Sequence, residues 1–298
     1  QLILSLAKDS AFHAPSVKEI EAADAIIIIG EDVTNVAPRI ALALRQSVRN
    51  KAMELADGCN IPQWQDAAVR ELAQHDRSPL AILSSYATRL DDVASDVVID
   101  SPAALINIAA AVANKISGNA PASSASDDVV EKIASQLGDA KHPLIIAGSS
   151  AGNIGQLQAA ANIARALNEK RGEVIDLCLL VPEVNTIGMS LLVSQYNNLG
   201  AALEKISSGQ AKKAIILEND LYRRAGHKSV DAALEKLEAT LVIDQVPTAT
   251  SAKASLVLPG TSSSEHEATY VNYEGRAQLS FQEHRNHAAA VPSWRWLS

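Results

Sequence analysis

Short runs of apolar residues alternate along the chain with longer segments in which apolar positions recur every three or four residues. In the first 118 residues, the runs with the length of strands are 2–6, 25–29, 80–84 and 96–99. The segments that predict helices are 16–23, which opens with a capping-box pattern, 38–55, which opens with a proline, and 64–74. This alternation predicts a parallel sheet with helices on both faces.

The same alternation returns in the second part of the chain. The predicted strands there are residues 144–147, 173–180, 214–217, 240–244 and 255–258. The predicted helices are 127–138, 156–168, 199–207 and 231–238. Parallel strands joined by helical crossovers are almost always right-handed, so a second sheet of the same kind follows. The predicted fold class is therefore α/β, with two doubly wound, mostly parallel-sheet domains.

The segment from Gly118 to Ser126 is small, polar and without periodicity, which is typical of a surface linker. A chain of 298 residues is long enough for two hydrophobic cores. We therefore predict one α/β domain at residues 1–118 and a second at 119–298.

Composition narrows the function classes. The net charge is −8 and basic residues are scattered, so nucleic acid is excluded as a partner. The apolar runs are far shorter than the roughly 20 residues that span a bilayer, which excludes direct membrane insertion. Two cysteines and the lack of a secretory signal predict a cytoplasmic location. The chain starts at Gln1 directly with an apolar run, which predicts a piece of a larger subunit.

The best candidate for a binding site is the turn after the predicted strand 144–147. Gly148, Ser149, Gly152 and Gly155 lie there in the pattern GSSAGNIG, between a strand and a helix. Glycines in such a turn allow backbone N–H groups and a helix N-terminus to approach a phosphate. The spacing GxxxGxxG differs from the dinucleotide pattern GxGxxG, so a tight turn without a ligand is the alternative interpretation.

Other residues that carry chemistry have simpler interpretations. Glu31 and Asp32 follow the strand 25–29, where open α/β sheets bind ligands, but two adjacent carboxylates repel a phosphate. We therefore expect a solvated loop there. Cys178 lies within an apolar strand and is predicted to be a core residue. Cys59 has no second cysteine nearby, so the chain cannot form a Cys-x-x-Cys cluster or house an iron–sulfur cluster.

The C-terminal histidines raise the question of a metal site. His266 stands between two glutamates, and His284 and His287 follow. Their loose spacing in a polar segment favours no metal. The serine-rich residues 261–264 lack the pattern of a nucleophile elbow, and no Ser–His–Asp set can be assembled. The sequence thus predicts no catalytic residue and no metal site.

A resemblance to a known family covers nearly the whole chain. Residues 269–278, TYVNYEGRAQ, preceded by ASLVLPG and by Glu265, resemble the pattern A-D-V-V-L-P … E … G-T … N-x-E-G-R-x-Q of the molybdopterin oxidoreductase family. The stretch ADAIIIIG at 23–30 resembles that family's A-D-x-I-x-x-x-G strand, and residues 143–148 resemble another of its strands. The resemblance implies the central α/β domains of that family.

One branch of the family is more similar than the others. Residues 30–46, Trp64 with Gln65, and residues 88–94 resemble the large iron–sulfur subunit of bacterial NADH:quinone oxidoreductase, respiratory complex I. That branch holds its iron–sulfur clusters in an N-terminal region and keeps the molybdopterin-enzyme fold without the cofactor in its C-terminal region.

The resemblance implies a structural region of this oxidoreductase, not catalytic by itself, which lies downstream of the electron-carrying clusters in the cytosolic peripheral arm. Its partners would be other peripheral-arm subunits, on the cytoplasmic side of the inner membrane. It implies no iron–sulfur cluster and no molybdopterin in this segment. Gly148, Ser149, Gly152 and Gly155 would then be the vestige of a cofactor site.

Two alternatives stay open. The chain could represent the cofactor-binding domains of a molybdopterin-dependent oxidoreductase, such as a formate dehydrogenase. It could also be a nucleotide-binding module that uses the glycines at 148–155. Acid extraction of a pterin would distinguish the first alternative, and thermal stabilisation by NADH or a nucleotide would distinguish the second.

Overall fold

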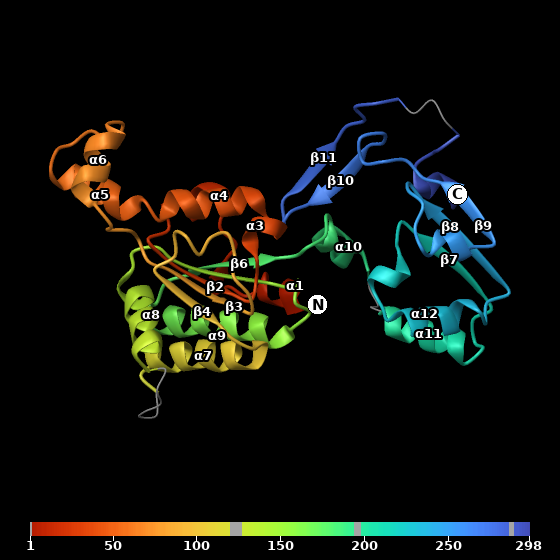
Figure 1. The fold of residues 1–298 in the computed structure, drawn as a ribbon, viewed down its shortest axis with the longest axis horizontal. Coiled ribbons are helices and arrows are strands. Elements are labelled where there is room, and N and C mark those ends of the chain that lie inside the picture. Colours follow the sequence, from red (N-terminus) through yellow and green to blue (C-terminus); the bar gives the residue numbers. More distant parts are fainter. Residues whose placement is uncertain (1, 120–126, 194–197, 286–288) are drawn as a thin grey trace. The chain divides into compact units, whose positions relative to one another are not determined.

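The computed structural model describes residues 2–119, 127–193, 198–285 and 289–298. Contacts divide the chain into two compact units, which we describe separately (Figure 1). Unit 1 comprises Gln1–Ser190 and Val271–Arg276, and unit 2 comprises Leu191–Tyr270 and Ala277–Ser298.

Unit 1 is built on a six-stranded parallel sheet with the order β1-β6-β5-β2-β3-β4. Its strands are β1 Phe12–His13, β2 Ala25–Ile29, β3 Leu80–Ser84, β4 Asp96–Ile99, β5 Pro143–Gly148 and β6 Ile175–Leu180. Every residue of β2, β3 and β5 is buried. These strands are continuous apolar runs because both faces of the sheet are covered.

Helices cover both faces of this sheet, as predicted for a doubly wound fold (Figure 1). The helices of this part of the chain are α1 Leu2–Leu6, α2 Val17–Ala22, α3 Val33–Val36, α4 Pro38–Ser47, α5 Asn50–Gly58, α6 Asp66–Ala73, α7 Pro102–Ile116, α8 Asp127–Asp139, α9 Ile154–Arg171 and α10 Thr186–Leu192. Of these, α1 to α4 and α7 to α9 contribute to the two cores against the sheet. Ile27 and Ile29 of β2 pack with α7, α8 and α9 in what we call the α9 core. Ile26 and Ile28 pack with α2, α3 and α4 in the α4 core.

Local sequence determines where several of these helices begin. The hydroxyl of Ser16 accepts a hydrogen bond from Glu19 N at 3.4 Å, and the Glu19 carboxylate accepts one from Ser16 N at 2.7 Å. This reciprocal capping box confirms the predicted start of α2. Pro38 occupies the first turn of α4, where its missing N–H costs nothing.

Two predictions about elements were wrong. Residues 2–6 form the helix α1, not a strand, because a five-residue apolar run fits a buried helix as well as a strand. The predicted helix 38–55 is interrupted between α4 and α5, where Val48 O accepts a hydrogen bond from Ser78 N. Asn50 donates its side-chain amide to two carbonyls near the end of α2, which fixes the new direction of the chain.

The predicted domain boundary at 118/119 falls inside unit 1. Strand β2, before that point, pairs with β5, after it, from Ala25↔Pro143 to Ile29↔Ala147. The predicted linker joins α7 to α8, which pack against each other, and its residues 120–126 lie outside the described residues. A segment that connects two helices of one domain can have the same composition as an interdomain linker, so composition alone cannot separate the two.

Unit 2 contains a three-stranded parallel sheet with the order β7-β8-β9. Its elements are α11 Leu199–Ser207, β7 Lys213–Leu217, α12 His227–Leu234, β8 Ala239–Asp244, β9 Leu256–Pro259, β10 Ala268–Val271 and β11 Ala277–Ser280, with 3-10 turns at Leu221–Arg223, Ser251–Lys253 and Ser293–Trp296. The predicted strand–helix alternation is therefore present here too. The second, two-stranded sheet of β10 and β11 was not predicted.

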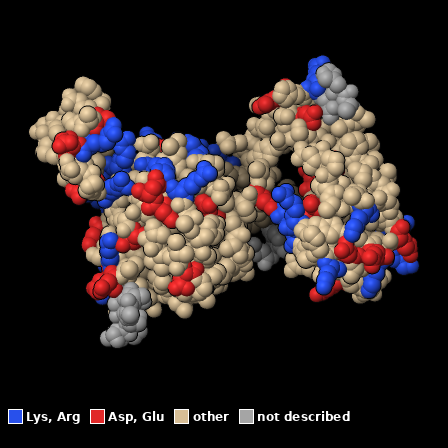
Figure 2. Space-filling view, in the orientation of Figure 1, with Lys and Arg blue, Asp and Glu red and all other residues tan. Residues whose placement is uncertain are grey.

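Charges of both signs are intermingled on the face of the molecule shown in Figure 2. Within the part of the chain that the structure describes, no helix has both the length and the apolar character needed to cross a bilayer.

Candidate functional site

The strand order of unit 1 reverses between β2 and β5. From β2 the chain proceeds through β3 to β4 on one side, whereas β5 is followed by β6 on the other side. Open α/β sheets bind ligands in the crevice at the carboxyl ends of the strands at such a switch point. Gly30 and Glu31 follow β2 there, and Gly148 and Ser149 lie at the end of β5. The topology thus brings together both loops that the sequence analysis considered.

The side chain of Glu31 closes this crevice. Glu31 is only 2% exposed, and its carboxylate accepts hydrogen bonds from Ser150 Oγ at 2.8 Å and from Ser150 N at 3.3 Å. A Cβ placed on Gly148 would lie 1.7 Å from Glu31 Oε2, so the carboxylate lies directly on the Gly148 backbone. Burial raises the pKa of Glu31, although the hydrogen bonds from Ser150 oppose that shift. The predicted solvated loop was therefore wrong at this residue.

Further oxygen acceptors surround Glu31. Asp32 is 8% exposed and caps α3, because its carboxylate accepts hydrogen bonds from Thr34 N at 3.1 Å and Asn35 Nδ2 at 2.6 Å. Gln156, 1% exposed, has its Oε1 buried without a partner, as is Oγ1 of Thr34. With Glu31 in place, this point is consequently rich in negative charge, which makes it a poor environment for a further anion.

The glycine-rich loop itself forms a tight turn. Ser149 O accepts a hydrogen bond from Gly152 N at 3.0 Å, and Gly152 has a left-handed φ of +64°. Asn153 caps α9 by accepting from Gly155 N at 2.9 Å. The turn interpretation accounts for this geometry, because the side chain of Asn153 already satisfies a backbone donor that could otherwise hold a phosphate.

We expect Glu31→Gln to stabilise the protein at high pH and to leave it unchanged at low pH. Because the folded-state pKa of Glu31 is raised, its contribution to stability is fully present below the ordinary glutamate value of 4.5 and is lost as the pH rises through the folded-state pKa. Glutamine has the same shape and no charge to bury. Urea midpoints of both proteins at pH 4 and pH 8 test this.

The matched control is Glu19→Gln, because the hydrogen bonds with Ser16 lower the pKa of Glu19. The sign is then reversed: the stabilisation from Glu19 is present above 4.5 and is lost as the pH falls through its folded-state pKa. Equal midpoints for Glu31→Gln and the unmodified protein at pH 8 would contradict the burial of an ionised Glu31.

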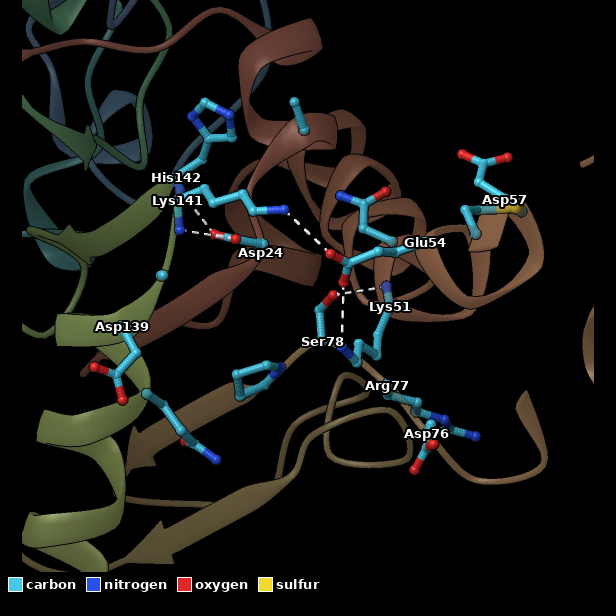
Figure 3. A pocket seen from close by; sticks show the side chains of 16 residues that line it. Asp24, Lys51, Glu54, Asp57, Asp76, Arg77, Ser78, Asp139, Lys141 and His142 are labelled. Carbon is cyan, nitrogen blue, oxygen red and sulfur yellow. Dashed lines mark hydrogen bonds and ion pairs between the residues drawn. The ribbon is translucent and has the colours of Figure 1, made fainter. Parts of the chain in front are cut away.

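A hollow of about 780 Å³ lies at the opposite end of the sheet, near the start of β2 and β5 (Figure 3). There Asp24 accepts hydrogen bonds from Lys141 N at 2.9 Å and His142 N at 2.8 Å. Glu54 of α5 pairs with the ammonium groups of Lys141 and Lys51, both at 3.1 Å, which lowers its pKa. Of these contacts, the Glu54–Lys141 pair links α5 to the segment before β5, and the Asp24 bonds link the starts of β2 and β5. These charged groups at the hollow therefore have partners within the fold.

The two cysteines and the C-terminal histidines are the remaining candidates. Cys178 is fully buried in the α4 core, and burial raises its pKa, whereas Cys59 is exposed. The ring of His266 lies 2.8 Å from Ser262 O, and His287 lies outside the described residues. Among the residues that are described, no group of three or more His, Cys, Asp or Glu side chains is placed to hold a metal ion.

The turn between β10 and β11 has a role that sequence analysis missed. Tyr273 donates its hydroxyl to Pro15 O at 2.7 Å and packs its ring on the α4 core. Asn272 accepts a hydrogen bond from Arg276 N at 2.9 Å, and Gly275 has φ +78°, which together fix the turn. The pattern residues Asn272 and Gly275 are therefore explained by the turn, and the turn places Tyr273, a variable position of the pattern, on the α4 core. The sequence signal that could have indicated this contact is the aromatic side chain of Tyr273 among the polar residues of the turn.

The strand order and its switch point define unit 1 as an open, doubly wound α/β protein. The model of the molybdopterin oxidoreductase family matches residues 6–295, and the chain belongs to that family. This confirms the resemblance inferred from its strands and from residues 269–278.

Curated relatives match this chain over its whole length. The G subunit of the NADH-quinone oxidoreductase of Pseudomonas fluorescens is 42% identical, that of Shewanella oneidensis 44%, and that of Escherichia coli K12 35%. In each case all of this chain is covered, together with 33–34% of the relative. The chain thus spans about a third of the length of these relatives.

A solved structure shows the same fold at low sequence identity. A chain of the formyltransferase/hydrolase complex from Methylorubrum extorquens, determined in complex with methylofuran, has a TM-score of 0.60. It is 14% identical, and the match covers 97% of this chain and 77% of that chain. At this identity the similarity concerns the fold alone.

Membership of the family raises the question of whether the crevice suits a molybdopterin, whose pyrophosphate is strongly anionic. The Glu31 carboxylate lies where the backbone of Gly148 would otherwise be open, and it uses the N–H and hydroxyl of Ser150. Asp32 and the unpaired oxygen of Gln156 lie alongside. Phosphate groups would meet the like charge of Glu31 and Asp32 here, so these residues do not fit the cofactor.

Proposed function

We propose that this chain is a structural, non-catalytic α/β region of the iron–sulfur subunit of a respiratory NADH-quinone oxidoreductase. Whole-chain identity of 35–44% to the G subunits of such oxidoreductases supports the assignment to that complex. One observation above all supports a non-catalytic role. The buried carboxylate of Glu31 fills the switch point between β2 and β5.

In this proposal the segment carries no cofactor, and the iron–sulfur clusters belong to a different part of the longer subunit. Gly148, Ser149, Gly152 and Gly155 are the vestige of a cofactor-binding loop. The region contacts other subunits of the peripheral arm on the cytoplasmic side of the membrane. The scattered charge and the apolar residues exposed in unit 2, such as Ile215 and Leu256, suit packing among proteins more than binding of nucleic acid.

The purified protein tests this proposal directly. We expect it to be colourless above 320 nm and to contain no stoichiometric iron or molybdenum. We also expect no fluorescent oxidised pterin after acid extraction. The control is a molybdopterin enzyme treated in the same way, which must release its pterin. Stoichiometric pterin from this protein would instead support the alternative of a molybdopterin-dependent oxidoreductase.

The nucleotide-binding alternative rests on the loop at 148–155, and its geometry gives no support. The turn at Ser149–Gly152 is closed on itself, and Asn153 caps the following helix. The Tm with and without NADH tests this alternative, because a ligand that binds the folded state raises Tm. An unchanged Tm is expected.

A further inference from the structure

Glu31 is bound in the way that a small anion is bound in other α/β proteins. A single oxygen, Oε2, accepts both the backbone N–H and the hydroxyl of Ser150, at 3.3 and 2.8 Å. The same oxygen lies over the Cα of Gly148, where any side chain would exclude it. This backbone donor and this hydroxyl donor, beside a glycine in the loop after a strand, form a small cradle for one carboxylate oxygen.

The carboxylate reaches this cradle from a different strand. Glu31 follows β2, whereas Gly148 and Ser150 follow β5, and 119 residues separate the two partners. Adjacent pairing of β2 and β5, with Ile29 opposite Ala147, brings the two loops together. Asp32, the neighbouring acid, does not enter the cradle, because its carboxylate is used in capping α3. One specific side chain therefore occupies the site.

We propose that the loop after β5 is an anion-binding site for a single carboxylate group, and that Glu31 fills it as an internal ligand. This goes beyond the proposed function, which requires only that the crevice is closed. The site here is a defined set of donors, Ser150 N–H and Ser150 Oγ–H above Gly148, which an external carboxylate can use when Glu31 is shortened.

Acetate is the appropriate probe. Substitution of Glu31 by alanine retains Cβ and removes one CH₂ group and the carboxylate, which are the heavy atoms of acetate. The Glu31→Ala variant therefore has a space of matching size next to two donors that have lost their acceptor. The unsatisfied donors and the space destabilise the variant, and a ligand that binds only the folded state reverses this.

The experiment compares Tm in sodium acetate and in sodium chloride of equal concentration at pH 7. For Glu31→Ala, acetate at about five times its dissociation constant should raise Tm by roughly 2–4 °C over chloride. The unmodified protein and Glu31→Gln, in which the cradle stays filled, should show no difference between the two salts. The double variant Glu31→Ala/Ser150→Ala should show a smaller acetate effect, because the hydroxyl donor is missing and only the backbone N–H of residue 150 remains.

Each other outcome overturns the proposal. An acetate effect of equal size in the unmodified protein would be a general effect of the salt. An acetate effect of undiminished size in the double variant would place the binding elsewhere. If Glu31→Ala is unfolded in chloride, refolding of the variant is attempted in each salt. Failure of acetate to restore the native circular dichroism then counts against the site. The metal and pterin contents of the unmodified protein are independent of these results.

Discussion

Replacing Gly30 by alanine is expected to destabilise the protein by about 2–5 kcal/mol. Gly30 has φ +66°, a left-handed conformation that costs an L-residue roughly 1–2 kcal/mol. The new Cβ would also lie 2.3 Å from Cδ of Gln156, which is 1% exposed and cannot move into solvent. Displacing a packed side chain of this kind costs roughly 1–3 kcal/mol. Urea unfolding of both proteins measures the loss.

Gly152→Ala is the matched control for this prediction. Gly152 also has a left-handed φ, +64°, but a Cβ there meets nothing within 4 Å. This variant should lose only the backbone cost of roughly 1–2 kcal/mol. Combining Gly30→Ala with Gln156→Ala should reduce the effect of the first substitution. Equal losses for the two glycine variants would show that Gln156 does not press on Gly30.

Tyr273→Ala is expected to destabilise unit 1 by about 2–3 kcal/mol, somewhat less than the loss when a fully buried aromatic side chain is replaced by alanine. The ring packs on the α4 core, and the hydroxyl donates to Pro15 O at 2.7 Å. Removing it uncovers apolar surface and leaves that carbonyl without its donor. Unfolding in urea measures the loss, and hydrogen exchange of the amides in β6 locates it.

Tyr273→Phe separates the two contributions. The phenylalanine keeps the ring and loses only the hydrogen bond, so a loss of about 1 kcal/mol is expected. A loss as large as that of the alanine variant would mean that ring packing contributes nothing. An unchanged stability for both variants would show that the turn is not anchored to unit 1.

The strands of the sheet were predictable because they are continuous apolar runs, and a parallel sheet covered on both faces produces such runs. Helix starts were predicted correctly where the signal is local in sequence, as for the capping box at Ser16 and the proline at Pro38. The five residues of α1 were too few for periodicity to distinguish a helix from a strand. The interruption after α4 depends on Asn50 and Ser78 bonding to distant backbone groups, which no local pattern reports.

The location of the candidate site was predictable from the sequence, but the burial of Glu31 and its hydrogen bonds were not. The two loops at 30–35 and 148–155 were identified because each follows a predicted strand. Their meeting at the switch point requires the strand order, which sequence alone did not supply. The burial of Glu31 depends on Ser150, 119 residues away, so an acidic pair that looks solvated locally becomes part of the interior. The capping role of Asp32, in contrast, is a local pattern.

The order in which the chain is made gives the turn Val271–Arg276 a further importance. About 80 residues of unit 2 separate it from the rest of unit 1 along the chain. At roughly 5–20 residues per second, the ribosome needs roughly 4–16 s to make that stretch. Part of the α4 core of the nascent unit 1 therefore stays exposed until Tyr273 has been synthesised. A pause in translation within unit 2 prolongs the time during which chaperones or proteases have access to that surface.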